Sequence, residues 1–576
     1  MNNRWNDLQL GILSGLLVVA CDLVARPFAE TGFMDDWSYK CLAQVFLQTG
    51  RVVYNGWPTT MVGWQIPYGA LFMKIFGPSF FAARLSTLPL AFGCVVLFHL
   101  CAERFGVRGF NALFGSLTFG LSPLVLPLVA SFMTDIGGVF VLLLCLYFCE
   151  RALLATRAKR AIAWLVLAAV SNILGGTIRQ IVWLGVLVLV PATAWLLRKR
   201  RGVLLIGAVL WGTGALCVLL FMHWFKQQPY TIPERILPDL KVGALHHVLK
   251  QLLFMVLCLG LIILPVLVAW VPEVRTLRGV RGKLFWTALP VSLFLFTTTL
   301  LLHGQQILMP WLQAVLDNEG VWSPMELLGN PPVTLGFKVR AIMSVIVIVA
   351  EVAFLAQLRW KPAEPSEIVD LEATGVVNWD AMRWLLSVFL AAYTLLLIPR
   401  AVAGQVFDRY FVCALPFVLM LLIRAYQQRI CRRLPSMSVA TLAVLSAFAV
   451  AALHDSFAGL RANMAAVAKL KIAGVPRTEI DAGWISNGLV QLELGSYVNN
   501  PLIEIPKSAF HSEPTVKRAP NCQNWFDALS PVIRERYVLT FGPVACLSDT
   551  RFAPTTYSTW LPPFDHTLYV EQIPNQ

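Results

Sequence analysis

Two adjacent aspartates, Asp35 and Asp36, follow the first long apolar segment of the chain, residues 8–25. Two carboxylates near a low-dielectric boundary raise each other's proton affinity or bind a cation. Either state suits a general base that deprotonates a hydroxyl or an amine. The position suits a substrate with a lipid tail and a polar head. The two residues can equally be ordinary polar residues at the start of a solvated loop.

Further polar residues stand at the ends of other apolar segments. Asp135 begins the fourth segment, where a helix dipole would stabilise its charge even without a function. Arg179 and Gln180 follow in a turn, and the planar guanidinium of an arginine engages two phosphate oxygens. Arg179 could instead extend to the membrane surface without binding anything. Lys226 and Arg235, in the next polar connection, are candidates for the same phosphate contact.

The composition defines the scaffold that must hold these residues. The 576 residues are 57% hydrophobic and 14% charged, with a mean hydropathy of +0.67, whereas soluble proteins are about a quarter charged. Apolar stretches of about 17 to 25 residues, long enough to cross a bilayer as a helix, recur about thirteen times. They begin near Leu8, Ser79, Phe110, Asp135, Ala161, Gln180, Val203, Val248, Leu284, Val339, Met382, Tyr410 and Ser438. The sequence predicts an all-α polytopic membrane protein.

The net charge of +14 is concentrated in alternate short connections, such as residues 198–201 and 424–433. This pattern is typical of cytoplasmic loops under the positive-inside rule, so it indicates a membrane partner and no nucleic acid. Thirteen spans would place the N-terminus inside, the C-terminus outside and every candidate residue on the outer side. The first apolar segment lacks a small-residue cleavage site and is interpreted as a retained anchor. The predicted location is the cytoplasmic (inner) membrane.

Two parts are predicted along the chain: a membrane body, residues 1–455, and an extracytoplasmic domain, residues 456–576. The body has a long first outer loop, residues 26–78, in which 37–47 and 64–76 have the pattern of helices lying in the membrane interface. Short strand-like pieces in the tail favour a small α+β fold. These pieces are residues 489–494, 537–541 and 568–570.

Cys522 and Cys546 are the only two cysteines in the predicted outer tail. Disulfides persist in oxidising compartments outside the cytoplasm. We therefore expect these two residues to form a disulfide, with two unpaired thiols as the alternative.

Several short stretches resemble, in order and spacing, the amino-terminal half of the C-type glycosyltransferase superfamily. The superfamily includes the protein O-mannosyltransferases, the lipid A aminoarabinose transferases and bacterial enzymes that glycosylate lipopolysaccharide. The stretches are Asp35-Asp36-Trp37-Ser38-Tyr39, Pro67-Tyr68-Gly69, Phe76-Gly77-Pro78-Ser79, Ala83-Arg84-Leu85-Ser86 and Thr134-Asp135. The resemblance covers about residues 8–200. One departure is that residues 62–66 lack the further acid that the aminoarabinose transferases carry late in this loop.

The resemblance implies an inverting transfer from a polyprenyl-phosphate sugar to a lipid, glycan or protein acceptor. It implies Asp36 or Asp35 as the catalytic base and Tyr39 as a substrate contact. It makes Asp135 a second acid near the donor or a bound cation. Asp408-Arg409-Tyr410 resembles a late pattern of the superfamily, which implies that Arg409 and Tyr410 contact the donor, although an Asp-Arg pair can also be a structural salt bridge.

The predicted reaction requires no cofactor, because phosphate is itself a competent leaving group, and it leaves a divalent cation open. Two other classes remain as alternatives. One is a lipid or glycolipid transporter or flippase, which would carry mid-span charges, broken helices and symmetric halves. The other is an inactive membrane scaffold with an outer binding domain.

Overall fold

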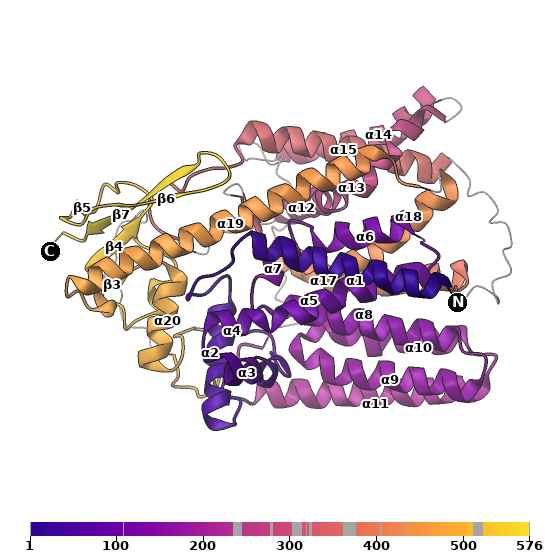
Figure 1. Ribbon diagram of the computed structural model, residues 1–576, viewed down its shortest axis with the longest axis horizontal. Helices are drawn as coiled ribbons and strands as arrows, with labels where there is room; N and C mark the ends of the chain where they lie inside the picture. The colour runs from indigo at the N-terminus through magenta and orange to yellow at the C-terminus, as the bar shows by residue number, and fades with distance from the viewer. Residues whose placement is uncertain are drawn as a thin grey trace.

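The computed structural model describes all residues except 1, 108, 234–244, 277–279, 302–313, 318–319, 322–324, 361–375, 404–405, 431–432, 511–521 and 575–576. Long helices run side by side along one direction, and a small sheet lies beyond one end of them (Figure 1). The two chain termini lie at opposite ends of the molecule (Figure 1). The expectation that they lie on opposite sides of a membrane stays a prediction.

Helices make up most of the first 472 residues. The first half contains α1 (Asn2–Val24), α2 (Asp36–Thr49), α3 (Gln65–Phe76), α4 (Phe80–Leu85), α5 (Thr87–Arg104), α6 (Phe110–Gly120), α7 (Leu126–Val129), α8 (Thr134–Leu153), α9 (Ala158–Gly175), η1 (Gly176–Ile178), η2 (Gln180–Trp183), η3 (Gly185–Leu189), α10 (Val190–Leu196) and α11 (Arg201–Lys226). The second half contains α12 (Leu245–Ile262), α13 (Leu264–Leu267), η4 (Val268–Trp270), η5 (Pro272–Thr276), α14 (Val280–Leu301), α15 (Phe337–Trp360), α17 (Trp379–Ala403), η6 (Asp408–Phe411), α18 (Leu415–Arg429) and α19 (Ser436–Ile472). Between α14 and α15, the two-residue strands β1 (Leu316–Asp317) and β2 (Gly320–Val321) pair antiparallel.

Within the described residues, eight helices are long and apolar enough to cross a membrane, or nine if the bent pair His247–Ile262 and Leu264–Arg275 forms one span. A helix occurs at each of the thirteen predicted positions, but a count of thirteen spans is not confirmed. For example, α6 and α18 have 11 and 15 residues, fewer than the roughly 20 that a span needs. The multi-pass architecture is nevertheless that of a membrane protein.

The first outer loop forms the two predicted helices, α2 and α3, followed by α4. Helix α2 runs across the ends of the long helices (Figure 1). It ends at Gly50, whose positive φ of 67° lets its N–H bond back to the Phe46 carbonyl at 2.8 Å. Helix α4 begins where the Ser79 side chain accepts a hydrogen bond from the Ala82 N–H. This loop is therefore ordered structure over the membrane body.

The C-terminal region is a small α+β fold, as predicted. It contains β3 (Ile480–Asp481), α20 (Trp484–Gly495), η9 (Asp527–Leu529), β4 (Tyr537–Thr540), β5 (Ser548–Asp549), β6 (Thr555–Ser558) and β7 (Asp565–Gln572). The sheet order is β3-β4-β7-β5, with β6 also paired to β7. The short 3-10 turn η7 (Arg477–Glu479) precedes β3.

Two of the three predicted strands of this region are confirmed, and one is wrong. The predictions at 537–541 and 568–570 correspond to β4 and β7. Residues 489–494 instead belong to helix α20, in which Ile485, Leu489 and Leu492, spaced i, i+4 and i+7, lie on one face. The period of the apolar residues is thus helical, because α20 packs this face against the aromatic side chains of the first outer loop.

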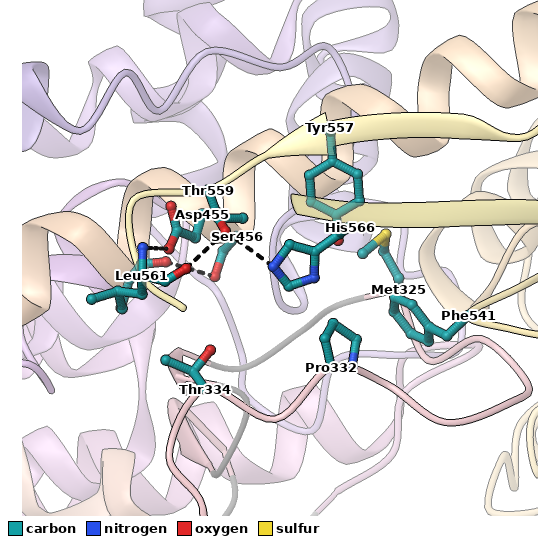
Figure 2. A pocket seen from close by; sticks show the side chains of 11 residues that line it. Met325, Pro332, Thr334, Asp455, Ser456, Phe541, Tyr557, Thr559, Leu561 and His566 are labelled. Atoms are coloured by element: carbon teal, nitrogen blue, oxygen red, sulfur yellow. Dashed lines mark hydrogen bonds between the residues drawn. The ribbon is translucent and has the colours of Figure 1, made fainter. Parts of the chain in front are cut away.

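Helix α19 joins the two parts. It is 37 residues long and continues through the predicted boundary at 455/456, so the domain boundary stays a prediction. Its Asp455 carboxylate accepts the backbone N–H groups of Trp560 at 2.7 Å and Leu561 at 2.9 Å, which fastens the sheet to the helix. Figure 2 shows Asp455 beside Leu561. A cavity of about 50 Å³ beside this joint also touches His566. It has room for only a few water molecules, so it is too small for a sugar donor.

The disulfide between Cys522 and Cys546 is confirmed, with the two Cα atoms 6.2 Å apart. It closes a loop with a sequence separation of 24 residues. In the chain-entropy model a loop of this length contributes roughly 3 kcal/mol to the stability of the domain.

Candidate active site

A cavity of about 300 Å³ lies among the first outer loop, the start of α8, the turn after α9, the segment from α17 to η6 and a loop of the C-terminal region. This volume is at the lower end of the range of about 300 to 1,000 Å³ that is usual for ligand pockets. Seven of the ten predicted site residues line it. They are Asp35, Tyr39, Asp135, Arg179, Gln180, Arg409 and Tyr410. The fold thus gathers residues that are up to 375 positions apart.

Asp35 faces this cavity from the start of α2. Its Oδ1 accepts a hydrogen bond from Trp57 Nε1 at 3.0 Å, and its Oδ2 pairs with Arg409 NH1 at 2.9 Å. The side chains of Asp35 and Arg409 keep 16% and 23% of their surface exposed. Asp35 is therefore an oriented carboxylate that a ligand in the cavity can reach.

Asp36 points into the protein interior and does not line the cavity. It is fully buried, and it accepts hydrogen bonds from the Phe33 N–H at 2.7 Å, from Arg84 Nε at 3.0 Å and from the Phe132 N–H at 3.3 Å. These bonds fasten the start of α2 to α4 and to the segment that precedes α8. All of these partners are internal, and the Asp36 carboxylate is not part of the cavity lining.

Asp135 and Arg179 form an ion pair in the cavity wall. Asp135 lies in the first turn of α8 and is fully buried, and its Oδ2 has no hydrogen-bond partner within the described part of the chain. Arg179 follows η1 in an extended conformation. Beside it, Gln180 Nε2 donates to the Thr59 carbonyl at 3.2 Å. The turn after α9 is in this way fixed to the first outer loop.

The aromatic ring of Tyr410 lies between two guanidinium groups. The Arg179 and Arg400 guanidinium carbons are 5.5 Å and 5.0 Å from the ring centroid, which is cation–π distance. With Arg409, three arginines line the cavity against two carboxylates, those of Asp35 and Asp135. The site therefore has an excess of positive charge and of bidentate donors, which suits an anion such as a phosphate.

The electrostatics around Asp35 also affect two neighbours. Burial and, secondarily, the charge of Asp35 raise the pKa of Tyr39 to about 12, so its hydroxyl remains a hydrogen-bond donor at neutral pH. Burial raises the pKa of Glu326 to about 6, and the Asp35 charge acts in the same direction. Trp525 Nε1 donates to this Glu326 carboxylate at 2.5 Å.

Besides Asp36, one predicted residue is absent from the lining, and another cannot be placed. Lys226 is exposed at the end of α11 and is not part of the lining. Arg235 lies outside the described residues. Among the residues that are described, no group of three or more His, Cys, Asp or Glu side chains is arranged to hold a metal ion.

Among the lining residues that the sequence prediction missed are Trp57, Arg400 and Asn500. Arg400 stands at the end of a predicted apolar segment, only nine positions before Arg409, so its type and place were an available signal. Trp57 was one of many tryptophans near the membrane surface. Asn500 lies in the tail among ordinary turn residues, and nothing in its sequence context indicates a site.

The chain has distant likenesses to solved structures. No protein-family model and no curated protein matches the chain. Among solved structures, the chain is similar to ArnT from Cupriavidus metallidurans bound to undecaprenyl phosphate, with 15% identity and a TM-score of 0.35 over 80% of this chain and 81% of that one.

Two further structures are similar. They are the oligosaccharyltransferase AglB from Archaeoglobus fulgidus in complex with an inhibitory peptide and a dolichol-phosphate (14% identity, TM-score 0.43, 92% of this chain and 64% of that one) and the arabinosyltransferase EmbB from Mycobacterium smegmatis (15% identity, TM-score 0.33, 77% and 40%). All of these TM-scores are below 0.5, so the function of this chain is argued from its own residues.

Proposed function

We propose that the protein is an inverting glycosyltransferase that moves a sugar from a polyprenyl-phosphate donor to a lipid, glycan or protein acceptor at the outer face of the cytoplasmic membrane. One observation carries the proposal: a single cavity combines the accessible carboxylate of Asp35 with the guanidinium groups of Arg179, Arg400 and Arg409. A base for the acceptor and cations for a phosphate leaving group are the two requirements of this reaction.

The surface beside the cavity supports a lipid-linked donor. Leu396 and Leu397 of α17 line the cavity, one turn before Arg400. On the same helix, Leu395 and Ile398 are 65% and 49% exposed. A phosphate held at Arg400 would thus have a continuous apolar surface beside it, along which a polyprenyl chain can extend into the bilayer.

The proposed step is a direct displacement. Asp35 accepts the proton of the acceptor hydroxyl or amine, and the freed electron pair attacks the anomeric carbon from the face opposite the phosphate. The bond between that carbon and the phosphate oxygen breaks, and its electron pair leaves with the lipid phosphate, whose charge the arginines stabilise. Asp35 can act only once the phosphate of the bound donor competes for Arg409, its present ion-pair partner.

No cofactor enters this step, and a divalent cation is a matter for experiment. Asp135 is the acid that such a cation would meet first, since its Oδ2 is without a partner in the described part of the chain. Turnover measured with EDTA, and again after readdition of Mg²⁺ or Mn²⁺, decides the requirement.

A transporter is the rival function with some structural support. Helices α12 and α13 bend by 71°, and the Glu351 carboxylate of α15 lies against Gly260 within this region. Broken helices and intramembrane acids are features of transporters. Neither Glu351 nor Gly260 lines the cavity that holds Asp35, and therefore the charged cavity favours group transfer.

Purified protein in lipid nanodiscs with a panel of radiolabelled polyprenyl-phosphate sugars tests the proposal. We expect cleavage of the sugar–phosphate bond, release of free polyprenyl phosphate, and inversion at the anomeric carbon of the product. Asp35→Asn is the matched inactive control. In sealed vesicles, movement of an intact donor across the bilayer without bond cleavage would establish the transporter instead.

A further inference from the structure

The loop that follows α20 reaches back from the C-terminal region into the membrane body. Two of its residues, Asn500 and Leu502, line the same cavity as Asp35 and the three arginines. They contribute alongside Ile232, which follows α11. Part of the cavity wall is thus formed by a residue 465 positions after Asp35 in the sequence.

This loop is held by backbone contacts to two other segments. The Val498 N–H donates to the Asn55 carbonyl at 2.8 Å, and the Ile505 carbonyl accepts the Tyr230 N–H at 2.6 Å. Tyr230 in turn accepts the N–H of Gly56 at 2.9 Å. Stacking of the Tyr230 and Tyr497 rings, with centroids 4.5 Å apart, adds a side-chain contact. The position of residue 500 is therefore fixed relative to the first outer loop.

Gly56 makes this close approach possible. It has a positive φ of 83°, and a Cβ atom placed on it would lie 2.7 Å from the Val498 carbonyl oxygen. Any larger residue at position 56 would push the loop of the C-terminal region away from the first outer loop. The first outer loop and the loop after α20 therefore pack backbone against backbone at Gly56.

The carboxamide of Asn500 is oriented by this loop. Asn500 is only 9% exposed, and one of its side-chain atoms accepts the Leu502 N–H at 2.9 Å. Because a backbone N–H only donates, that atom must be the carbonyl oxygen Oδ1. The amide nitrogen Nδ2 has no hydrogen-bond partner within the described residues, and it belongs to a side chain that lines the cavity.

We propose that the C-terminal region supplies a sugar-binding wall of the donor cavity, and that Asn500 Nδ2 donates to a hydroxyl of the transferred sugar. This inference rests on the glycosyltransferase function proposed above. The arginines suit the phosphate and Asp35 suits the acceptor proton, whereas a neutral amide donor on a mostly buried side chain suits a hydroxyl oxygen. A sugar that displaces water from this donor and leaves it unpaired loses binding energy, so Asn500 acts as a specificity-determining residue.

Asn500→Asp separates this role from a purely structural one. The aspartate keeps an acceptor for the Leu502 N–H and so preserves the loop, but it cannot donate when ionised. We expect it, like Asn500→Ala, to lower kcat/KM for the preferred donor about 10- to 100-fold and to lower the preference over donors with other hydroxyl patterns. Lys507→Ala, an exposed change in the same segment, serves as the control.

Binding measurements complete the test. Affinities for the sugar-linked lipid and for sugar-free polyprenyl phosphate are compared by intrinsic tryptophan fluorescence in nanodiscs. Asn500→Ala should lower the affinity for the sugar-linked lipid and leave the affinity for sugar-free polyprenyl phosphate unchanged. If Asn500→Ala retains wild-type donor preference and the wild-type ratio of the two affinities, the inference is overturned while the proposed function stands. If the wild-type protein cleaves no donor and does not distinguish the two lipids, both proposals fail.

Discussion

Asp35 and Asp36 are neighbours in sequence with the same functional group, yet their side chains contact different regions of the molecule. Asp35 has one arginine and one indole as partners and remains open to a cavity. Asp36 has an arginine and two backbone N–H groups as partners and is closed to solvent. The internal hydrogen bonds to the carboxylate, rather than its position in a motif, separate the acid that a ligand could reach from the acid that is closed off.

Asp408 and Arg409 show the same contrast between a buried side chain and a neighbour that lines the cavity. Asp408 is fully buried and accepts the N–H groups of Val315 at 3.0 Å, Leu316 at 2.7 Å and Arg409 at 2.7 Å. Arg409 extends the other way, to Asp35 in the cavity. In both places a buried carboxylate accepts backbone N–H groups, and its sequence neighbour lines the cavity.

The largest effect should come from Asp35→Asn. The amide still accepts the Trp57 hydrogen bond but cannot take up a proton, and a missing general base costs roughly 10² to 10⁴-fold in kcat. Turnover of the labelled donor and thermal unfolding in detergent are measured together. Trp57→Phe is the control that removes the hydrogen bond and keeps the carboxylate, so it should lose far less activity. Near-normal turnover of Asp35→Asn would rule out Asp35 as the base.

Asp36→Asn should act on stability instead. Removing one member of a buried ion pair leaves the Arg84 charge uncompensated, which typically costs 3–5 kcal/mol. We expect a lower unfolding temperature and lower yield, with the kcat of the folded fraction changed only severalfold. A variant that folds as well as the wild type but has lost its turnover would reverse the assignment of the two aspartates.

The sequence was sufficient for the features that depend on local pattern. Apolar length predicted the helices, the period of residues 37–47 and 64–76 predicted α2 and α3, and the type and placement of Asp35, Arg179 and Arg409 predicted most of the charged cavity lining. The choice between Asp35 and Asp36 could not be made, because it depends on Arg84 and on the Phe132 N–H, which only tertiary packing brings close. Asn500 was missed for the same reason: its neighbours in the cavity come from other segments of the chain.

The smallest effect is a pH dependence of stability at Asp408. Burial, opposed by the N–H groups of Leu316, Val315 and Arg409, raises its pKa from the ordinary 3.8 to about 6. The folded state therefore binds a proton more tightly than the unfolded state, and this contribution to stability is full below about pH 4 and is lost as the pH rises through 6. Through this group the free energy of unfolding of the wild type should fall by about 1–3 kcal/mol between pH 4 and 6. The side chain in Asp408→Asn is neutral at every pH, so this fall should be absent from the variant. Other titrating groups, such as Glu326, contribute equally to both proteins and cancel in the difference. If the free energies of unfolding of the wild type and of Asp408→Asn change in parallel from pH 4 to 6, the Asp408 carboxylate has the same pKa in the folded and the unfolded state. Burial would then not be what sets Asp408 apart from the accessible Asp35.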